Sequence, residues 1–315
     1  MKILMFGRGV ISTQYAWAFE RAGHIVEFYV RPGRKAEYGA TVTLNLLDAR
    51  KKIRGVAVKE DWRVKLIEDF NANHNYDLIF VSVQHYQFKK VAEYLSDKIG
   101  KSTLLLLNNF WEEPLDQTKN LPTEQLVWGF PMAGGGFDNN RVLNGSLFGS
   151  ISIGTFGTEV TERTKEVVAL FQSADIKPKI SKDFRAYLLG HFIVDAAFAL
   201  ERINYPTSEG LLKALKTSTY WRNVIANGKE LLPILKARNV VLANSSDLKL
   251  LSVPPWLISF AMKIVLRFLP AMKQMLAGHS NQTEMKAYCQ DVFATAKKMN
   301  IGIARFTKNK NLFQQ

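Results

Sequence analysis

The feature that most constrains this chain is a glycine turn between two apolar runs near its start. The first run is Lys2–Phe6, the turn is Gly7–Ser12 (GRGVIS), and a helical pattern continues to Gly23. A second apolar run, Ile25–Val30, follows. This order predicts a strand, a glycine turn, a helix and a second strand, which is the βαβ unit that binds dinucleotides.

The residue types in the turn suit a pyrophosphate. Gly7 permits a tight turn, and Gly9 has no Cβ, so a phosphate can approach the N–H groups at the helix N-terminus. Ser12 occupies the third glycine position and is small enough for close helix-strand packing. An ordinary strand-to-helix turn is the alternative, but the second strand favours a dinucleotide site. The predicted cofactor contacts are Gly7, Arg8, Gly9, Val10, Ile11 and Ser12.

The end of the second strand indicates which nicotinamide cofactor is bound. NAD sites usually have an Asp or Glu there, which holds the ribose 2′-hydroxyl. This chain has Arg31 and Arg34 instead, and guanidinium groups suit a 2′-phosphate. The sequence therefore predicts NADP(H). A basic surface loop is the alternative interpretation.

Composition is typical of a globular protein with two domains. The chain has 315 residues, 47% of them hydrophobic and 22% charged. Strand patterns dominate up to about residue 180 and helical patterns follow, so we expect an α/β Rossmann-type NADP-binding domain (residues 1–180) and an all-helical substrate or dimerisation domain (residues 181–315). A single cysteine, Cys289, and no recognisable signal peptide favour the cytoplasm.

The net charge of +14 does not by itself indicate nucleic-acid binding. The cations are spread along the chain and no DNA- or RNA-binding motif accompanies them, so we expect no nucleic-acid partner. A phosphate-rich cofactor and an anionic substrate would both be attracted to a basic cleft.

One apolar segment, Leu251–Leu276, raises the question of a membrane. Lys263, Arg267 and Pro270 interrupt it, whereas a spanning helix needs about 20 residues largely without charge. The sequence leaves three alternatives: a core helix, a homodimer face or a basic amphipathic helix on a membrane surface. Of these, we expect core or dimer packing before membrane contact.

Further strands are expected between the first motif and residue 180. Thr41–Val58 reads as a hairpin inserted into the sheet domain, and Asp77–Val83 and Thr103–Leu107 read as buried parallel strands. Pro131–Gly136 reads as a flexible loop that brings backbone close to a ligand, and Val142–Phe156 reads as a second hairpin. Gln84 follows a buried strand, where nicotinamide contacts are expected.

Together, these features resemble the ketopantoate reductase family over nearly the whole chain. The resemblance depends on the glycine turn, the strands DLIFVSV and LLLLNN, the glycine-rich run and the helical second half. It implies NADPH-dependent reduction of a 2-keto acid, 2-dehydropantoate in the family itself.

Individual family residues are changed or retained here. The family's catalytic lysine position holds Tyr187, and two family asparagines become His191 and Asp195. A second family lysine corresponds to Gln84, and a substrate-binding serine corresponds to Met272. By the same resemblance, Asn109 and Glu284 are retained cofactor contacts. The changes favour a carbonyl related to 2-dehydropantoate.

The residues of the first helix in the second half also suggest chemistry directly. Tyr187, His191 and Asp195 are spaced i, i+4 and i+8, so they share one helix face. Hydride reduction of a carbonyl needs a proton donor, and His191 oriented by Asp195 is the first candidate, with Tyr187 the second. A histidine buried in a core or interface is the alternative. No metal-ligand spacing is present, so no metal site is expected.

The leading function is therefore an NADPH-dependent reductase of a small anionic carbonyl compound. A non-catalytic NADPH-binding sensor or interaction protein is the alternative from another class. An enzyme that works at a membrane surface and a homodimer are both compatible with the apolar segment.

Overall fold

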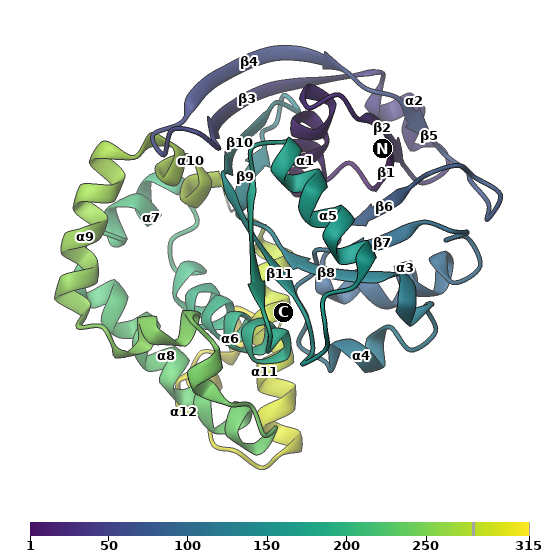
Figure 1. Cartoon of the computed structure of the whole chain (residues 1–315). Helices are drawn as coiled ribbons and strands as arrows, with labels where there is room; N and C mark the ends of the chain where they lie inside the picture. Colours follow the sequence, from purple (N-terminus) through teal and green to yellow (C-terminus); the bar gives the residue numbers. More distant parts are fainter. Residues whose placement is uncertain (279–280, 315) are drawn as a thin grey trace. The chain divides into compact units, whose positions relative to one another are not determined.

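Residues 1–278 and 281–314 are described by a computed structural model, shown in Figure 1. The chain divides into two units, each assembled from several segments. Unit 1 contains residues 1–108 and 114–182 together with α10 (Pro270–Gly278), and unit 2 contains residues 109–113, 183–269 and 281–314. The predicted division of the chain into two folding domains, residues 1–180 and 181–315, is not tested by these units and stays a prediction.

Unit 1 is built on an eight-stranded sheet. Its strands are β1 (Lys2–Phe6), β2 (Ile25–Tyr29), β5 (Leu66–Ile67), β6 (Leu78–Val81), β7 (Thr103–Leu106), β8 (Leu126–Phe130), β11 (Ser150–Gly154) and β12 (Lys177–Ser181). The order is β12-β11-β8-β7-β6-β1-β2-β5. Neighbouring strands are parallel along the part β8-β7-β6-β1-β2-β5. Numbered along the chain, β5-β2-β1-β6-β7-β8 has the 3-2-1-4-5-6 order of dinucleotide-binding sheets.

A second, four-stranded sheet also belongs to unit 1. Its strands are β3 (Thr41–Ala49), β4 (Val56–Arg63), β9 (Ala133–Phe137) and β10 (Leu143–Phe148), in the order β4-β3-β10-β9. The predicted first hairpin is β3–β4, which forms two long curved strands in Figure 1, and it lies in this separate sheet.

The hairpin predicted over Val142–Phe156 is wrong. β10 pairs with β3 and β9, whereas β11 pairs with β8 and β12 in the main sheet. The chain changes sheets at Gly149, where an added Cβ would lie 2.2 Å from the carbonyl oxygen of Arg50. Alternation of side chains predicted the two strands correctly but carries no information about their partners.

The glycine-rich run predicted as a ligand-binding loop is strand β9. A Cβ at Gly134 would lie 2.6 Å from Met275, and one at Gly136 would lie 2.6 Å from the carbonyl oxygen of Gly278. Met275 and Gly278 belong to α10, so the missing side chains allow α10 to lie directly on β9. These two glycines therefore serve internal packing.

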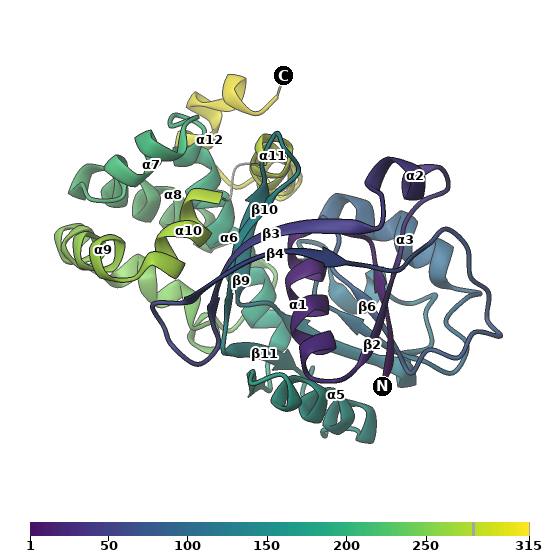
Figure 2. The same cartoon turned by 90° about the horizontal axis from the view of Figure 1, so that it is seen from above.

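Besides α10, unit 1 contains the helices α1 (Val10–Arg21), α2 (Arg34–Tyr38), α3 (Phe88–Leu95), α4 (Pro114–Gln117) and α5 (Glu162–Ser173). Phe171 of α5 meets Tyr15 and Phe19 of α1, with ring centroids 5.7 and 5.4 Å apart. Tyr94 of α3 stacks on Tyr29 of β2 at 5.3 Å. Figure 2 shows α1 beside the β3–β4 hairpin, where Trp17 Nε1 donates to Glu60 at 2.6 Å. α1 thus packs against both sheets.

The helices of unit 2 are α6 (Phe184–Arg202), α7 (Ser208–Ala214), α8 (Ser218–Ala237), α9 (Pro255–Phe268), α11 (Gln282–Lys298) and α12 (Ala304–Lys308). Asp183 caps the N-terminus of α6, since its carboxylate accepts a hydrogen bond from the N–H of Ala186 at 3.0 Å. Its apolar residues share a core with Leu231 of α8 and Val292 of α11. The residues described after Ser181 form no strand, and the predicted α/β fold with a helical C-terminal part is confirmed.

Among the described helices, none is by itself long and apolar enough to cross a membrane. α9 and α10 meet the length and composition requirement only when they are taken together as a broken pair.

The replacement of Gly135 by alanine should destabilise unit 1 by about 3 kcal/mol. Gly135 has φ of +144°, and its Cβ would lie 2.2 Å from the backbone oxygen of Asn144 in β10. Chemical denaturation measures the loss. Gly302→Ala is the matched control, since Gly302 has ordinary φ and open space around it. Equal stability of the two variants would contradict this account of β9.

Candidate active site

The glycine turn follows β1 at the edge where parallel strands end. Gly7 has φ of +96°, and Gly9 precedes α1 with no side chain capping the helix. A Cβ added to either glycine would meet no atom within 4 Å. The first N–H groups of a helix have no intrahelical acceptor. The turn Gly7–Ser12 therefore presents backbone donors to open space, as a phosphate site requires.

Arg8 lies within this turn among aromatic rings. Its guanidinium is 4.5 Å from the ring centroid of Tyr38 and 5.8 Å from that of Phe137. Nη1 donates to the carbonyl oxygen of Thr41 at 3.4 Å, whereas Nε is buried without a hydrogen-bond partner. Burial lowers the pKa of Arg8, but an arginine stays protonated in proteins.

The two arginines predicted to select NADP(H) differ in their contacts. Arg34 is paired with Glu37 at 2.5 Å and donates to Tyr38 Oη at 3.1 Å. Arg31 is exposed and forms no ion pair among the residues that the structure describes. Arg31 is thus the more available cation for a ligand phosphate.

Gln84, the predicted nicotinamide contact, lies just beyond β6 and is half-buried.

In unit 2, α6 brings the three predicted polar residues to one face. His191 Nε2 lies 3.2 Å from Asp195 Oδ2, and His191 Nδ1 lies 2.5 Å from Asp247 Oδ2. The Tyr187 ring stacks on Phe184 at 5.4 Å and on His191 at 6.2 Å. His191 is therefore held between two carboxylates.

A hydrogen-bonded row continues from Asp195 through unit 2. Asn109 Nδ2 donates to Asp195 Oδ2 at 2.9 Å and to Tyr288 Oη at 3.4 Å. Tyr288 in turn donates to Glu284 at 3.3 Å. Asn109 Oδ1 is buried with no hydrogen-bond partner, so the row keeps one acceptor available. We call Asp247, His191, Asp195, Asn109, Tyr288 and Glu284 the polar row.

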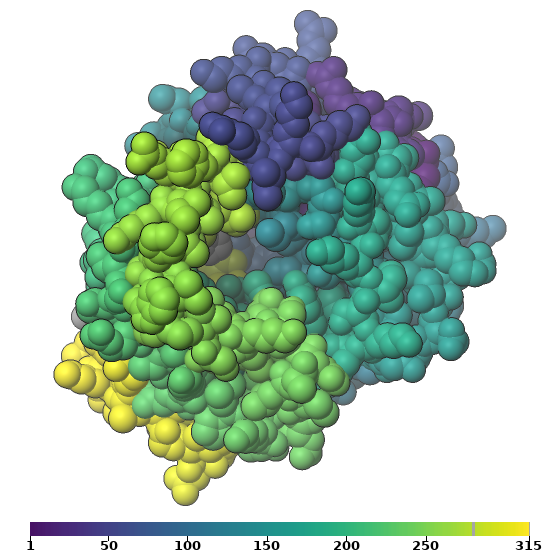
Figure 3. Space-filling model, turned by 60° about the vertical axis from the view of Figure 1, so that its left-hand side comes forward, coloured from purple at the N-terminus to yellow at the C-terminus, as the bar shows by residue number. Residues whose placement is uncertain are grey.

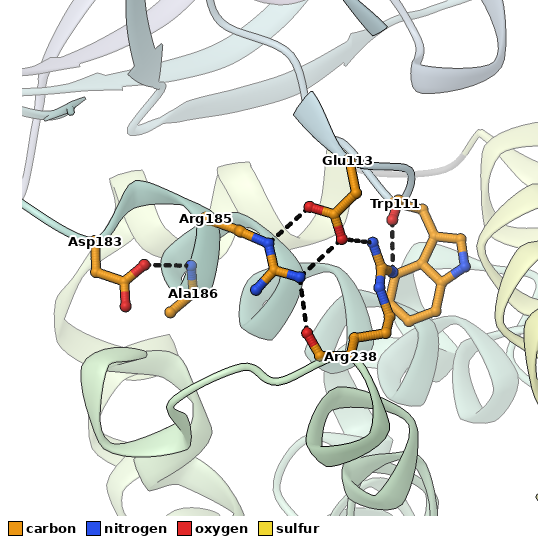
Figure 4. Close-up of polar contacts among 6 residues, drawn as sticks. All are labelled: Trp111, Glu113, Asp183, Arg185, Ala186 and Arg238. Atoms are coloured by element: carbon orange, nitrogen blue, oxygen red, sulfur yellow. Dashed lines mark hydrogen bonds and ion pairs between the residues drawn. The ribbon is translucent and has the colours of Figure 1, made fainter. Parts of the chain in front are cut away.

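An ionic cluster next to Asn109 fixes the segment that carries it (Figure 4). Arg185 donates to both carboxylate oxygens of Glu113, at 2.6 and 2.8 Å, and Arg238 donates to one of them at 2.9 Å. Arg238 also donates to the carbonyl oxygen of Trp111 at 2.7 Å. Hydrogen bonds from Arg185 above all lower the pKa of Glu113 to about 2. The cluster stays charged at neutral pH and ties residues 109–113 to the helices of unit 2.

Sequence reasoning missed Asp247 and Tyr288. Tyr288 lies four residues after Glu284 on α11, and this spacing could have placed the two on one helix face. Asp247 lies at the start of a 3₁₀ turn, Asp247–Ser252, and no local pattern links it to His191. Only the tertiary fold brings these two side chains together.

The structure places Met272, predicted to line the substrate pocket, in α10 of unit 1. It packs against a small apolar cluster of Ala49, Phe148 and Ala271. Core packing accounts for this position, and its predicted substrate contact stays a prediction. Among the described residues, no group of three His, Cys, Asp or Glu side chains could hold a metal ion.

The polar row holds a proton on His191 at neutral pH. Burial disfavours the charged imidazole, but the charges and hydrogen bonds of Asp195 and Asp247 outweigh it and raise the pKa of His191 to about 10. Burial raises the pKa of Tyr288 well above its usual value, with the charges of Asp195 and Glu284 adding to the effect. The row therefore has one imidazolium facing two carboxylates.

A sheet in the dinucleotide-binding order with a glycine turn after its first strand defines a Rossmann-type fold. Residues 3–158 match the family described as ketopantoate reductase PanE/ApbA. This part of the chain therefore belongs to the ketopantoate reductase family. A comparison with curated protein sequences gives no match.

Solved structures resemble the chain over its whole length. A PanE/ApbA family ketopantoate reductase from Ralstonia eutropha has 17% identity and a TM-score of 0.71, with 100% of this chain and 97% of that chain covered. A D-mandelate dehydrogenase with NADH and anilino(oxo)acetate has 16% identity and a TM-score of 0.72 at the same coverage. A 2-dehydropantoate 2-reductase from Geobacter metallireducens has 16% identity and a TM-score of 0.69, with 100% and 99% covered. At these identities the likeness is one of fold.

Replacing Asp247 by asparagine should lower the pKa of His191 by about one unit or more, since it removes one of two facing charges. In the wild type, the raised pKa contributes stability that is full below about pH 6.5 and lost as the pH rises through about 10. Asp247→Asn should reduce this contribution, with a loss of about 1–3 kcal/mol at pH 7.

NMR titration of the histidine rings and denaturation at several pH values check the prediction. Asp116→Asn, at an exposed position, is the control. An unchanged His191 titration in Asp247→Asn would show that the contact does not control the proton.

Proposed function

We propose that the protein is a nicotinamide-dependent oxidoreductase that reduces the carbonyl group of a small molecule, in the class of 2-keto acids and related carbonyl compounds. The observation that carries the proposal is the open, uncapped turn Gly7–Ser12 after the first strand of a sheet in the dinucleotide-binding order. The family match over residues 3–158 supports it. Similar structures are described as reductases of 2-dehydropantoate and as a D-mandelate dehydrogenase with NADH.

The residues of unit 1 fit a phosphorylated dinucleotide. Gly9, which has no side chain and has open space beside it, and the first turn of α1 suit the pyrophosphate. Arg31 and Arg34 suit a 2′-phosphate, and the sequence directly after β2, residues 30–35, contains no Asp or Glu that could hold a 2′-hydroxyl. We therefore favour NADP(H), which supplies the hydride when it is bound.

The polar row supplies the other requirement of carbonyl reduction, a proton for the oxygen. Hydride adds to the carbonyl carbon, and the oxygen must then be protonated. His191 is charged at neutral pH because its pKa is raised to about 10, and its two ring nitrogens face Asp195 and Asp247. We assign His191 as the proton source of the row and Tyr187 as the second candidate. Asn109 Oδ1, buried without a partner, can accept a hydrogen bond from a ligand.

Two further features of the proposal are a homodimer and a cytoplasmic location. One similar structure is described as a dimeric ketopantoate reductase from Staphylococcus aureus.

Cofactor preference is tested by fluorescence titration with NADPH and NADH. The wild type should prefer NADPH, and Arg31→Ala should weaken NADPH binding about tenfold while leaving NADH binding unchanged, because one cation to the 2′-phosphate is lost. Arg63→Ala is the control, since Arg63 is an exposed arginine of β4. If neither nucleotide binds, the glycine turn has no cofactor role and the proposed function fails.

Turnover is tested with NADPH and a series of 2-keto acids and neutral ketones. His191→Gln should lower kcat about 100-fold with little change in NADPH affinity, because it removes the proton source and not a cofactor contact. Undiminished turnover in His191→Gln would assign the proton donor elsewhere, with Tyr187→Phe as the next variant. Cofactor binding without turnover of any carbonyl would instead support a non-catalytic nucleotide-binding protein.

A further inference from the structure

α9 of unit 2 has an apolar face that the other described residues leave uncovered. Trp256, Phe260 and Phe268 are 64%, 57% and 49% exposed, and Leu257 and Ile264 are exposed as well. A helix that served only the core would bury these side chains. Figure 3 shows the yellow-green segment that includes α9 at the surface of the molecule.

The other side of α9 is anchored within unit 2. Ile258 and Leu266 are buried, and the hydroxyl groups of Ser259 and Ser218 are 3.1 Å apart across the contact with α8. The helix is therefore fixed in its rotation about its own axis, and its exposed face is set by packing.

The exposed face also carries positive charge. Lys263 and Arg267 are exposed and lie one turn apart, next to Trp256 and Phe260 on the i, i+4, i+7, i+11 stripe of the helix. From Leu248 to Thr283 the sequence contains no Asp or Glu. The net charge of the chain is +14. Any occupant of this face should thus combine an apolar interior with negative charge at its surface.

We propose that α9 docks on the surface of a bilayer that contains anionic lipids. Aromatic and aliphatic side chains of a helix lying in the interface enter the boundary between headgroups and acyl chains, while lysine and arginine contact the lipid phosphates. A second copy of this chain fits less well, because the same face of the copy brings cations and no carboxylate. The proposal does not depend on the proposed enzymatic function.

Co-sedimentation of the full chain with lipid vesicles tests this docking. The protein should sediment with vesicles of phosphatidylcholine and phosphatidylglycerol, and about tenfold less with phosphatidylcholine alone or at high salt. Phe260→Asp and the double variant Lys263→Glu/Arg267→Glu should each lower binding to the anionic vesicles about tenfold or more. Thermal unfolding checks that these surface variants fold.

Matched controls distinguish vesicle binding by α9 from attraction by the net charge of the whole protein. Val241→Asp changes an exposed apolar residue of the same unit, and Lys89→Glu/Lys90→Glu makes the same charge change at exposed positions of α3. Both should bind like the wild type. No binding to anionic vesicles, or equal losses in variants and controls, would overturn the proposal. A dimer that Phe260→Asp converts to a monomer, without vesicle binding, would assign the face to a second copy.

Discussion

The packing of α1 against two sheets is the interaction on which unit 1 depends. Gly7 permits the backbone to turn at φ of +96°, a region that other residues rarely adopt, and α1 starts three residues later. Tyr15 accepts a hydrogen bond from the N–H of Met132 at 3.1 Å, and Gln14 donates to the carbonyl oxygen of Gly134 at 3.3 Å. Since these buried contacts hold the helix, its N-terminus does not need a side-chain cap, and its first N–H groups stay available to a ligand.

In unit 2, one side of α6 packs against aromatic rings and another side carries polar groups. Phe192 on its apolar side stacks on Trp111 at 5.0 Å and meets Tyr288 edge-on at 4.8 Å. These rings place Asn109 and the Tyr288 hydroxyl beside Asp195, which lies on the polar side of the same helix. The hydrogen-bonded row is therefore ordered by the aromatic packing next to it, together with the Glu113 ion pairs.

Local periodicity was sufficient to predict the parts of the structure in which neighbours in sequence are neighbours in space. It predicted the first βαβ unit, the β3–β4 hairpin, and the i, i+4 pairing of His191 with Asp195. It failed where a distant segment decides the structure. The glycines of β9 are explained by α10, and Asp247 reaches His191 from a turn on another part of the chain. Neither relation leaves a periodic signal in sequence.

Charge in the polar row restricts how a substrate could be placed beside it. α6 contains no lysine, and the imidazolium of His191 is already shared by Asp195 and Asp247. A substrate carboxylate next to this row would face net negative charge in a partly buried environment, where repulsion between charges is strong. A carbonyl oxygen, which becomes more basic as hydride arrives, would instead gain from the proton that the row holds. Under the proposed function, the electrostatics of unit 2 therefore favour approach by the carbonyl end of a substrate, and cations outside the row would have to bind any anionic end.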